Sequence, residues 1–172
     1  MNYQSEQRRL HQTLSINGSK NRMDSIPNDT IAYDKIKVRS LNASDLQLLD
    51  SVNLIVNIFG AADSIYNYYY EIDSKYAQVY QYRGARFYFL DGKLDSYEIR
   101  DNSFLVGNAS VGPYFTVGDN ISKLTPYIPN YLANKKDGRI FATITGIPRE
   151  MFIYIEYNLL TEKIITISIR SY

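Results

Sequence analysis

Short runs of alternating apolar and polar residues recur along the chain and are separated by turn-forming residues. The run YDKIKVRS places Ile36 and Val38 between charged side chains, and SIYNYYYEI, YAQVYQYRG and ARFYFL follow further along. The dipeptide Asp91-Gly92, which is typical of tight hairpin turns, precedes the run KLDSYEIR. The runs GRIFATI and EMFIYIEYNLLTEKIITISI continue the pattern toward the C-terminus. Alternation of this kind predicts antiparallel strands joined by hairpins.

Two other stretches carry apolar residues at the spacing of three and four that is typical of an amphipathic helix. In the first, Ser44 and Gln47 match a capping box, and Gly60 is placed to end the helix. In the second, Asp119 is the expected N-cap of a helix of about two turns, which Pro126 shortens or kinks. The expected buried face of the first helix consists of Leu48, Leu49, Val52, Ile55, Val56 and Phe59.

The order of these elements predicts the fold class. Residues 1–31 are polar and have no sustained period, so we expect a flexible N-terminal arm. A helix followed by a meander of strands then occurs twice, over residues 32–112 and over residues 113–172. The segments DGKLDSYEI and TEKIITISI also match each other in their order of apolar and polar residues. We therefore expect an α+β fold made of two tandem helix-plus-antiparallel-meander units.

Composition narrows the classes of function. The chain of 172 residues has no cysteine, which removes disulfide bonds, thiolate zinc sites and cysteine nucleophiles. Its formal net charge of +1 gives no general attraction to nucleic acid, and we expect no nucleic-acid partner. No run approaches the ~20 apolar residues of a membrane-spanning helix. Glycine motifs that hold phosphate groups do not occur, and we expect no cofactor.

The sequence offers few residues for catalysis. His11 is the single histidine and lies in the polar arm, so we expect neither a histidine-based triad nor a metal site. A pair of carboxylates could act as acid and base. Most of the carboxylates lie at predicted turns, however, where aspartate is favoured for local hydrogen bonding. We therefore expect no enzymatic activity and keep a small carboxylate-dependent hydrolase as an alternative. Its candidate residues are Glu71, Asp73, Asp91, Asp95 and Asp101.

The middle of the chain is rich in tyrosine, with eight tyrosines in residues 65–89. We expect Tyr66, Tyr68 and Tyr70 to face inward, together with Ala77 and Val79 on the next strand and Phe87 and Phe89 on the one after it. The remaining residues would then form an outward patch, which we interpret as a partner-binding site because Tyr and Arg dominate binding hot spots. The other interpretation is that the rings form ordinary cross-strand pairs in a half-exposed sheet. The expected patch consists of Tyr69, Glu71, Tyr80, Tyr82, Arg86 and Tyr88.

Stacked aromatic residues on a sheet also occur in sites for single-stranded nucleic acid and for glycans. Residues 41–112 carry an excess of acidic side chains, which argues against a phosphate backbone as the ligand. The chain has no tryptophan, which makes a glycan platform less favourable. These observations leave another protein as the expected partner.

The segment DSVNLIVNIFGAADSIYNYYY and the later GARFYFLDGKLDSYEI together resemble the repeating unit of the SmpA/OmlA (BamE) outer-membrane assembly lipoproteins. That unit has a helix ending at Phe-Gly, then a Tyr-x-Tyr strand, then an F-x-F-x-D-G-K-L hairpin. Two such units in tandem resemble the fold of the β-lactamase inhibitor protein. The phrase VGDNISKL with the later IPN is similar to one found in exported lipoprotein-like proteins of Bacteroidetes. The resemblance covers roughly residues 41–172 and implies a non-enzymatic role in envelope assembly or in inhibition of another protein.

The expected function is thus a non-catalytic protein-binding module of an exported type. Its most specific form is an inhibitor or immunity protein that blocks a secreted toxin or hydrolase through the tyrosine-rich sheet face. A structural accessory lipoprotein of cell-envelope assembly is the first alternative. The expected location is the periplasm or the cell surface, and both a lipid anchor outside this sequence and a cytoplasmic location are left open.

Overall fold

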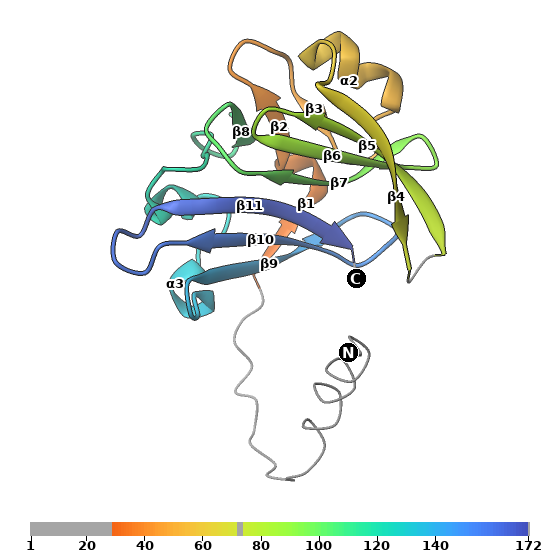
Figure 1. Cartoon of the computed structure of the whole chain (residues 1–172). Helices are drawn as coiled ribbons and strands as arrows, with labels where there is room; N and C mark the ends of the chain where they lie inside the picture. Colours follow the sequence, from red (N-terminus) through yellow and green to blue (C-terminus); the bar gives the residue numbers. More distant parts are fainter. Residues whose placement is uncertain (1–28, 72–73, 172) are drawn as a thin grey trace, which may run out of the picture.

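An eight-stranded mixed sheet dominates the computed structural model, which describes residues 29–71 and 74–171 (Figure 1). Across the sheet the strands follow the order β1, β9, β10, β11, β7, β6, β5, β4. Neighbouring strands are antiparallel except for β1 and β9, which are parallel. The bounds are β1 Thr30–Ala32, β4 Ser64–Tyr70, β5 Lys75–Tyr82, β6 Ala85–Leu90, β7 Lys93–Ile99, β9 Arg139–Thr145, β10 Met151–Tyr157 and β11 Ile164–Ser171.

Tight turns produce the hairpins of this sheet, as the alternating sequence runs predicted. Asp91 and Gly92 both have positive φ, 51° and 75°, which is the backbone of the two-residue turn that matches the twist of paired strands. Gly84 has a φ of 77° and closes the turn between β5 and β6. A Cβ at Gly84 would clash with the Asp101 side chain, so this turn needs glycine for space as well as for conformation. The predicted strands in this part of the chain are confirmed.

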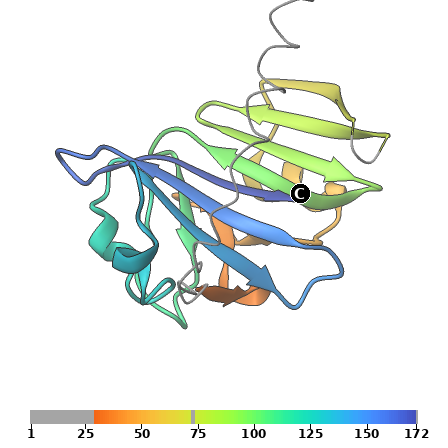
Figure 2. The same cartoon turned by 90° about the horizontal axis from the view of Figure 1, so that it is seen from below.

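Two local meanders build the large sheet. The first contains β4 to β7 and the second contains β9 to β11. They join where β7 lies antiparallel to β11, through the pairs Ile99 with Ile167, Glu98 with Ser168, and Tyr97 with Ile169. The view from below shows β4 and β5 at one end of the sheet, away from β9 and β10 (Figure 2).

A second sheet of three strands packs on one face of the large sheet. Its order is β3, β2, β8, with bounds Leu46–Gln47, Lys37–Ser40 and Phe104–Gly107. Aromatic rings fill the space between the two sheets. Phe104 of β8 lies 5.4 Å from Phe87 of β6 and 6.1 Å from Tyr82 of β5, measured between ring centroids. The opposite face of the large sheet is called the outer face below.

The helix α2, Val52–Phe59, covers the end of this aromatic core. Its last residue, Phe59, lies 5.3 Å from Phe87 and 5.3 Å from Phe104, ring centroid to ring centroid. Ile55 is fully buried, while Val52 and Phe59 are partly buried against the core. Gly60 ends the helix with a φ of 82°, as predicted. The predicted burial of Val56 is wrong, because this side chain is exposed.

The predicted start of this helix at Ser44 is also wrong. Residues before Ser51 form β3 and a turn instead, and Leu49 there has a positive φ of 74°. Backbone pairing with the large sheet accounts for the difference: Leu49 N donates to Leu94 O, and Leu94 N donates to Asp50 O. Leu46 in β3 and Leu48 in the following turn are buried in the core, so tertiary contacts override the helical spacing that begins at Leu48.

The second predicted helix is much shorter than expected. The chain forms a 3₁₀ turn, η2, over Ile121–Leu124, followed by the single-turn helix α3, Tyr131–Asn134. Asn120 rather than Asp119 caps η2, because its side chain accepts from Ser122 N at 2.9 Å. Asp119 accepts instead from Thr116 N and from Lys123 Nζ. Another 3₁₀ turn, η1, spans Tyr33–Lys35.

The expected α+β fold of two tandem helix-plus-antiparallel-meander units is therefore wrong. Strands are the main regular structure of the described residues, and the two meanders form one sheet instead of two separate units. Pairing β7 with β11 gives both strands a second neighbour, which satisfies backbone groups that two separate sheets would leave at open edges. Residues 1–28 of the expected N-terminal arm lie outside the described residues, and the domain boundaries at residues 31 and 112 stay predictions.

Candidate partner-binding surface

The hairpin of β4 and β5 presents tyrosine side chains on both of its faces. Tyr66 and Tyr68 are exposed on the outer face, and Tyr69 and Tyr76 are exposed on the opposite face. Tyr68 is 49 % exposed and Tyr76 is 68 % exposed. β4 is the last strand of the sheet, so its side chains have cross-strand neighbours only on β5. The edge position therefore explains why tyrosines of β4 remain accessible.

On the outer face the tyrosine rings form a connected cluster. Tyr68 lies 5.5 Å from Tyr70 and 5.9 Å from Tyr88 in edge-to-face arrangements, measured between ring centroids. Tyr70 stacks on Tyr88 at 6.4 Å. Val79 lies in the same cross-strand row as Tyr66 and Tyr88 and has no exposed surface. The cluster thus shields an apolar strand position while its own edges stay in contact with solvent.

A polar network holds the inner end of this cluster. The Tyr70 hydroxyl lies 2.9 Å from Ser96 Oγ and donates to Asp95 Oδ2 at 3.4 Å. Arg149, from the loop between β9 and β10, donates to Asp95 Oδ1 at 2.5 Å. Burial is the main cause that raises the pKa of Tyr70 above its ordinary value, so this ring stays neutral over the physiological range.

A β-bulge in β7 brings this polar network within hydrogen-bonding reach of Tyr70. The register of β6 and β7 shifts between Tyr88 and Phe89, because Tyr88 pairs with Ser96 whereas Phe89 pairs with Leu94. Asp95 is therefore the extra residue on β7, between Leu94 and Ser96. A bulge re-aims side chains locally, which explains how Tyr70 reaches both Asp95 and Ser96.

The opposite face of the hairpin carries a second, smaller aromatic pair. Tyr69 and Tyr76 are cross-strand partners whose ring centroids lie 5.0 Å apart. Further along β5, Tyr80 and Tyr82 occupy the same face but lie in the core, at 9 % and 7 % exposure. The Tyr82 hydroxyl donates to Gly60 O at 2.9 Å, and burial raises the pKa of Tyr82 to about 12.

The structure does not bring the six predicted binding residues onto one surface. Tyr69 and Glu71 are exposed at the end of the hairpin, and Tyr80 and Tyr82 are buried. The remaining two, Arg86 and Tyr88, are half-buried on the outer face. Burial raises the pKa of Tyr88, and the Glu98 carboxylate adds to this effect while a hydrogen bond from Arg86 opposes it.

The expected outward orientation of Tyr80 and Tyr82 is wrong because cross-strand neighbours share a face. Tyr80 pairs with Phe87, which the alternation in β6 correctly placed in the core. The same rule places Val79 opposite Tyr88, on the outer face. Tyr66 and Tyr68 were missed as accessible residues, and the signal that could have found them is the lack of a further strand beyond β4.

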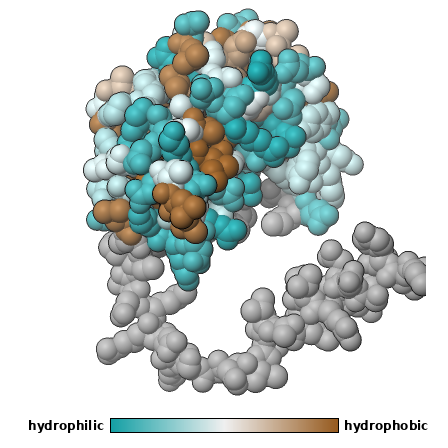
Figure 3. Space-filling model, turned by 60° about the vertical axis from the view of Figure 1, so that its left-hand side comes forward, coloured by the Kyte–Doolittle hydropathy of each residue, from teal (hydrophilic) through white to brown (hydrophobic). Residues whose placement is uncertain are grey.

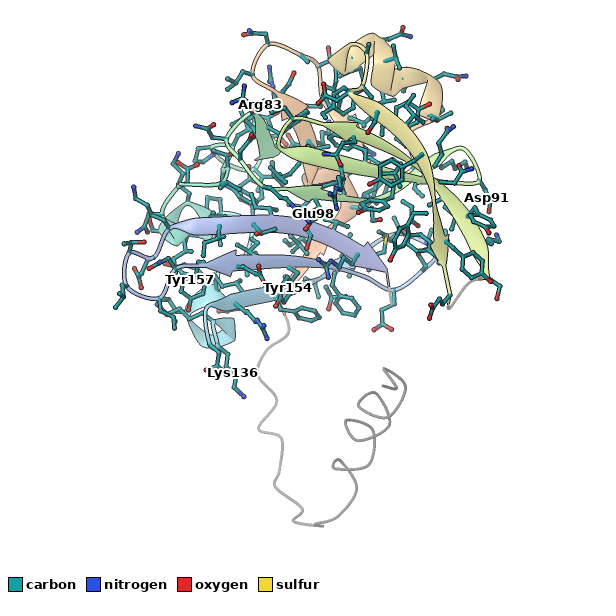
Figure 4. The ribbon with its side chains drawn as sticks, viewed as in Figure 1. Arg83, Asp91, Glu98, Lys136, Tyr154 and Tyr157 are labelled. Atoms are coloured by element: carbon teal, nitrogen blue, oxygen red, sulfur yellow. The ribbon has the colours of Figure 1, made fainter. Side chains whose placement is uncertain are left out.

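The outer face continues past the tyrosine cluster toward the second meander. Glu98 of β7 and Tyr154 of β10 lie on this face in the middle of the sheet (Figure 4). The rings of Phe141 and Phe152 stack nearby with centroids 4.6 Å apart, and the Arg170 guanidinium lies 6.0 Å from the Tyr154 ring centroid. Aromatic residues thus occupy both ends of the outer face, with charged and small residues between them.

Three of the five candidate carboxylates for catalysis have separate structural partners. Asp91 forms an ion pair with Lys75 at 2.7 Å, and Asp101 accepts from Ser103 N at 2.8 Å. Asp95 is bound by Arg149, as described above, whereas Asp73 lies outside the described residues. Within residues 29–71 and 74–171, no group of three or more acidic or histidine side chains is placed to hold a metal ion.

Two further observations concern membrane-spanning helices and exposed apolar side chains. Within the part of the chain that the structure describes, no helix is long and apolar enough to cross a membrane. The described residues also show a second group of exposed apolar side chains in the turn between β10 and β11, where Leu159 and Leu160 are 66 % and 94 % exposed. Figure 3 turns the left-hand side of the molecule forward, and on this side patches of hydrophobic residues lie among hydrophilic ones.

Comparison with known proteins identifies no relative of this chain. The resemblance to the SmpA/OmlA (BamE) lipoproteins therefore stays a prediction, and any proposal about function depends on the surface of the molecule itself. The chain matches no protein-family model, no curated protein and no solved structure.

Proposed function

We propose that the protein is a non-catalytic protein-binding module and that the β4–β5 hairpin is its binding surface. The observation that carries this proposal is the exposure of tyrosine on both faces of one hairpin, by Tyr66 and Tyr68 on one side and Tyr69 and Tyr76 on the other. Exposed apolar patches of this kind are uncommon on monomeric proteins unless they contact a partner. Tyrosine suits such a contact because its ring buries a large area while its hydroxyl forms hydrogen bonds.

The rigidity of part of the surface supports the proposal. Tyr70 and Tyr88 are held by ring contacts and by the Asp95 network, so these rings lose little conformational freedom when a partner binds. Side chains that are ordered before binding give more affinity for the same buried area. Tyr68 packs against both of these rings and is half-exposed, which makes it the expected centre of the contact.

The most specific form of the proposal is an inhibitor or immunity protein that blocks an exported toxin or hydrolase. A hairpin with aromatic residues on both faces can contact both walls of a cleft, which is how a binding protein would block an enzyme. The periplasm or cell surface is the proposed location. A carboxylate-dependent hydrolase gains no specific support, because Asp91, Asp95 and Asp101 each bind a separate partner within the described residues.

The test compares partner capture by two double variants. Tyr69→Ser with Tyr76→Ser removes two exposed rings from the hairpin, and Leu159→Ser with Leu160→Ser is the matched control at the β10–β11 turn. Proteins captured from the native host by the wild-type protein are identified, purified and titrated against both variants. We expect the tyrosine variant to lose about thirtyfold in affinity, which corresponds to ~2 kcal/mol, and the leucine variant to lose little. Equal affinity for both variants would contradict the proposed surface.

A further inference from the structure

The outer edge of β4 is the longest open strand edge among the described residues. β4 spans seven residues and pairs with β5 on one side only. The opposite edge strand of the large sheet, β1, spans three residues, and β3 in the small sheet spans two. The edge of β8 is closed by its own chain, since Val106 and Phe115 exchange two backbone hydrogen bonds. Alternate residues of β4 therefore direct backbone N–H and C=O groups away from β5, where no strand among the described residues pairs with them.

The features by which proteins usually protect a sheet edge are missing from β4. The strand Ser64–Tyr70 contains neither a charged residue nor a proline, and its register with β5 is regular over all seven pairs. Lysine, proline and bulges are the usual means of preventing an added strand from pairing. An unprotected edge of this length is suited to pairing with an extended segment from another chain.

Charge is placed at both ends of this edge. Asp63 precedes β4 and Glu71 follows it, and both are exposed. Neither carboxylate has an ion-pair partner among the described residues. An antiparallel strand that covers β4 would therefore end opposite one carboxylate and begin opposite the other.

These charges also indicate which kind of strand can pair with the open edge of β4. In a fully overlapping antiparallel pair of two copies, Asn67 would lie opposite Asn67, and Asp63 would lie opposite Glu71 of the second copy at both ends. Like charges directly opposite each other destabilise strand pairing. A different protein whose strand has basic ends would instead form two favourable pairs at the same positions.

We propose that β4 binds an extended segment of its partner as an added antiparallel strand, with uncharged residues opposite Ser64–Tyr70 and Lys or Arg at both ends. This inference rests on the proposed function and names the class of partner for the same hairpin. Backbone hydrogen bonds to β4 supply part of the affinity, and the rings of Tyr66, Tyr68 and Tyr69 select the side chains of the added strand. The two basic residues set its register.

The direct test uses two synthetic peptides and the full chain. Both peptides have alternating Thr and Val in the middle; one carries Lys at both ends and the other carries Glu. We expect the lysine peptide to bind at least about tenfold more tightly by calorimetry, and to slow hydrogen exchange of amides in β4. Equal binding of the two peptides, no binding, or protection elsewhere in the chain would overturn the inference.

Variants of the protein separate this inference from the proposed function. Asp63→Asn with Glu71→Gln should lower the affinity for the lysine peptide several-fold and remove most of its dependence on salt. Asn67→Pro removes one backbone donor from β4, and Asn67→Lys is the milder variant if proline prevents folding. If a captured partner depends on Tyr69 and Tyr76 but binds Asn67→Lys normally, the binding function stands and strand addition is refuted. If no captured partner loses affinity when Tyr69 and Tyr76 are replaced, the proposed function itself is refuted.

Discussion

Strands β4 and β6 lie two positions apart in one sheet, and both are rich in aromatic residues, but their surroundings differ. β6 has β5 and β7 on its two sides, and its alternate residues Phe87 and Phe89 are buried between the sheets. β4 has one neighbour, and six of its seven residues are exposed. Aromatic composition alone therefore does not separate a core strand from an exposed edge strand. The number of neighbouring strands separates the two, because a strand with a neighbour on each side is shielded from solvent along both of its edges.

The largest expected difference between the two strands is in stability. Phe87→Ala should lower the free energy of unfolding by about 3–5 kcal/mol, because it leaves a cavity among Phe59, Tyr82 and Phe104. Tyr68→Ala in β4 should cost less than about 1 kcal/mol, since half of that side chain is already in solvent. Urea unfolding of both variants measures the difference. Similar costs would show that the two strands are equally part of the core.

A second difference is expected at alkaline pH. Burial raises the pKa of Tyr82 from 10.0 to about 12, and burial also raises the pKa of Tyr97 and of Tyr70. Above pH 10 the unfolded chain releases protons that these folded side chains retain, so the free energy of unfolding falls as pH rises from about 10 to 12. We expect a loss of about 2 kcal/mol or more by pH 11, measured by urea unfolding. Tyr97→Phe should make this fall shallower, and equal stability at pH 8 and pH 11 would contradict the assignment.

The hydroxyl groups of buried tyrosines should contribute unequally to the free energy of unfolding. The Tyr127 hydroxyl accepts from Asn108 N at 3.0 Å and lies 3.0 Å from Gly112 O, so it organises the loop between β8 and η2. Tyr127→Phe should cost about 1–2 kcal/mol in the free energy of unfolding, because it leaves these backbone groups without a partner. Chemical denaturation at pH 7 tests this, and a neutral effect would mean that the loop is held by other contacts.

Tyr97 is the matched case with the opposite expectation. Its ring lies beside Phe87 in the core, and its hydroxyl has no hydrogen-bond partner among the described residues. Tyr97→Phe removes only that hydroxyl, so stability should stay the same or rise by up to about 1 kcal/mol. A clear loss of stability in the same denaturation experiment would show that the hydroxyl has a partner after all.

The smallest effect on stability is expected for Asn67→Lys at the open edge of β4. Asn67 is exposed, so the melting temperature should change little, with a free-energy change within about 0.5 kcal/mol. Binding of the lysine-ended peptide should nevertheless fall strongly, because a lysine at an edge opposes an added strand. Retained binding with an unchanged melting temperature would place the partner on a face of the hairpin instead of its edge.

Local signals in the sequence predicted most of the strands and turns. Asp91-Gly92 predicted its hairpin because its backbone preference is local and strong. Gly60 predicted the end of α2 for the same reason. The start of α2 could not be predicted in this way, since Leu48 and Leu49 continue the helical spacing of the residues after them and yet form a turn, in which Leu49 N donates to Leu94 O.

The candidate site was predicted only in part, because it depends on which strand lies at the edge. Tyr69 and Glu71 were correctly expected to be exposed, whereas Tyr80 and Tyr82 were assigned to the wrong face. The register between β5 and β6 would have corrected the expected orientation of Tyr80, because Tyr80 pairs with Phe87, which was already expected in the core. The exposure of both faces of β4 follows from the order of eight strands, which involves pairing between residues far apart in the sequence.

The seam between β7 and β11 has a consequence for how the chain folds. Each meander forms from neighbouring segments with short loops, so each can assemble quickly and on its own. The seam has only three registered residue pairs, and these join strands that are far apart in the sequence. Closing it requires the whole intervening chain to be ordered, so we expect it to form late. Until then, β7 and β11 are both open edges, and the order of events during synthesis determines how long they stay exposed.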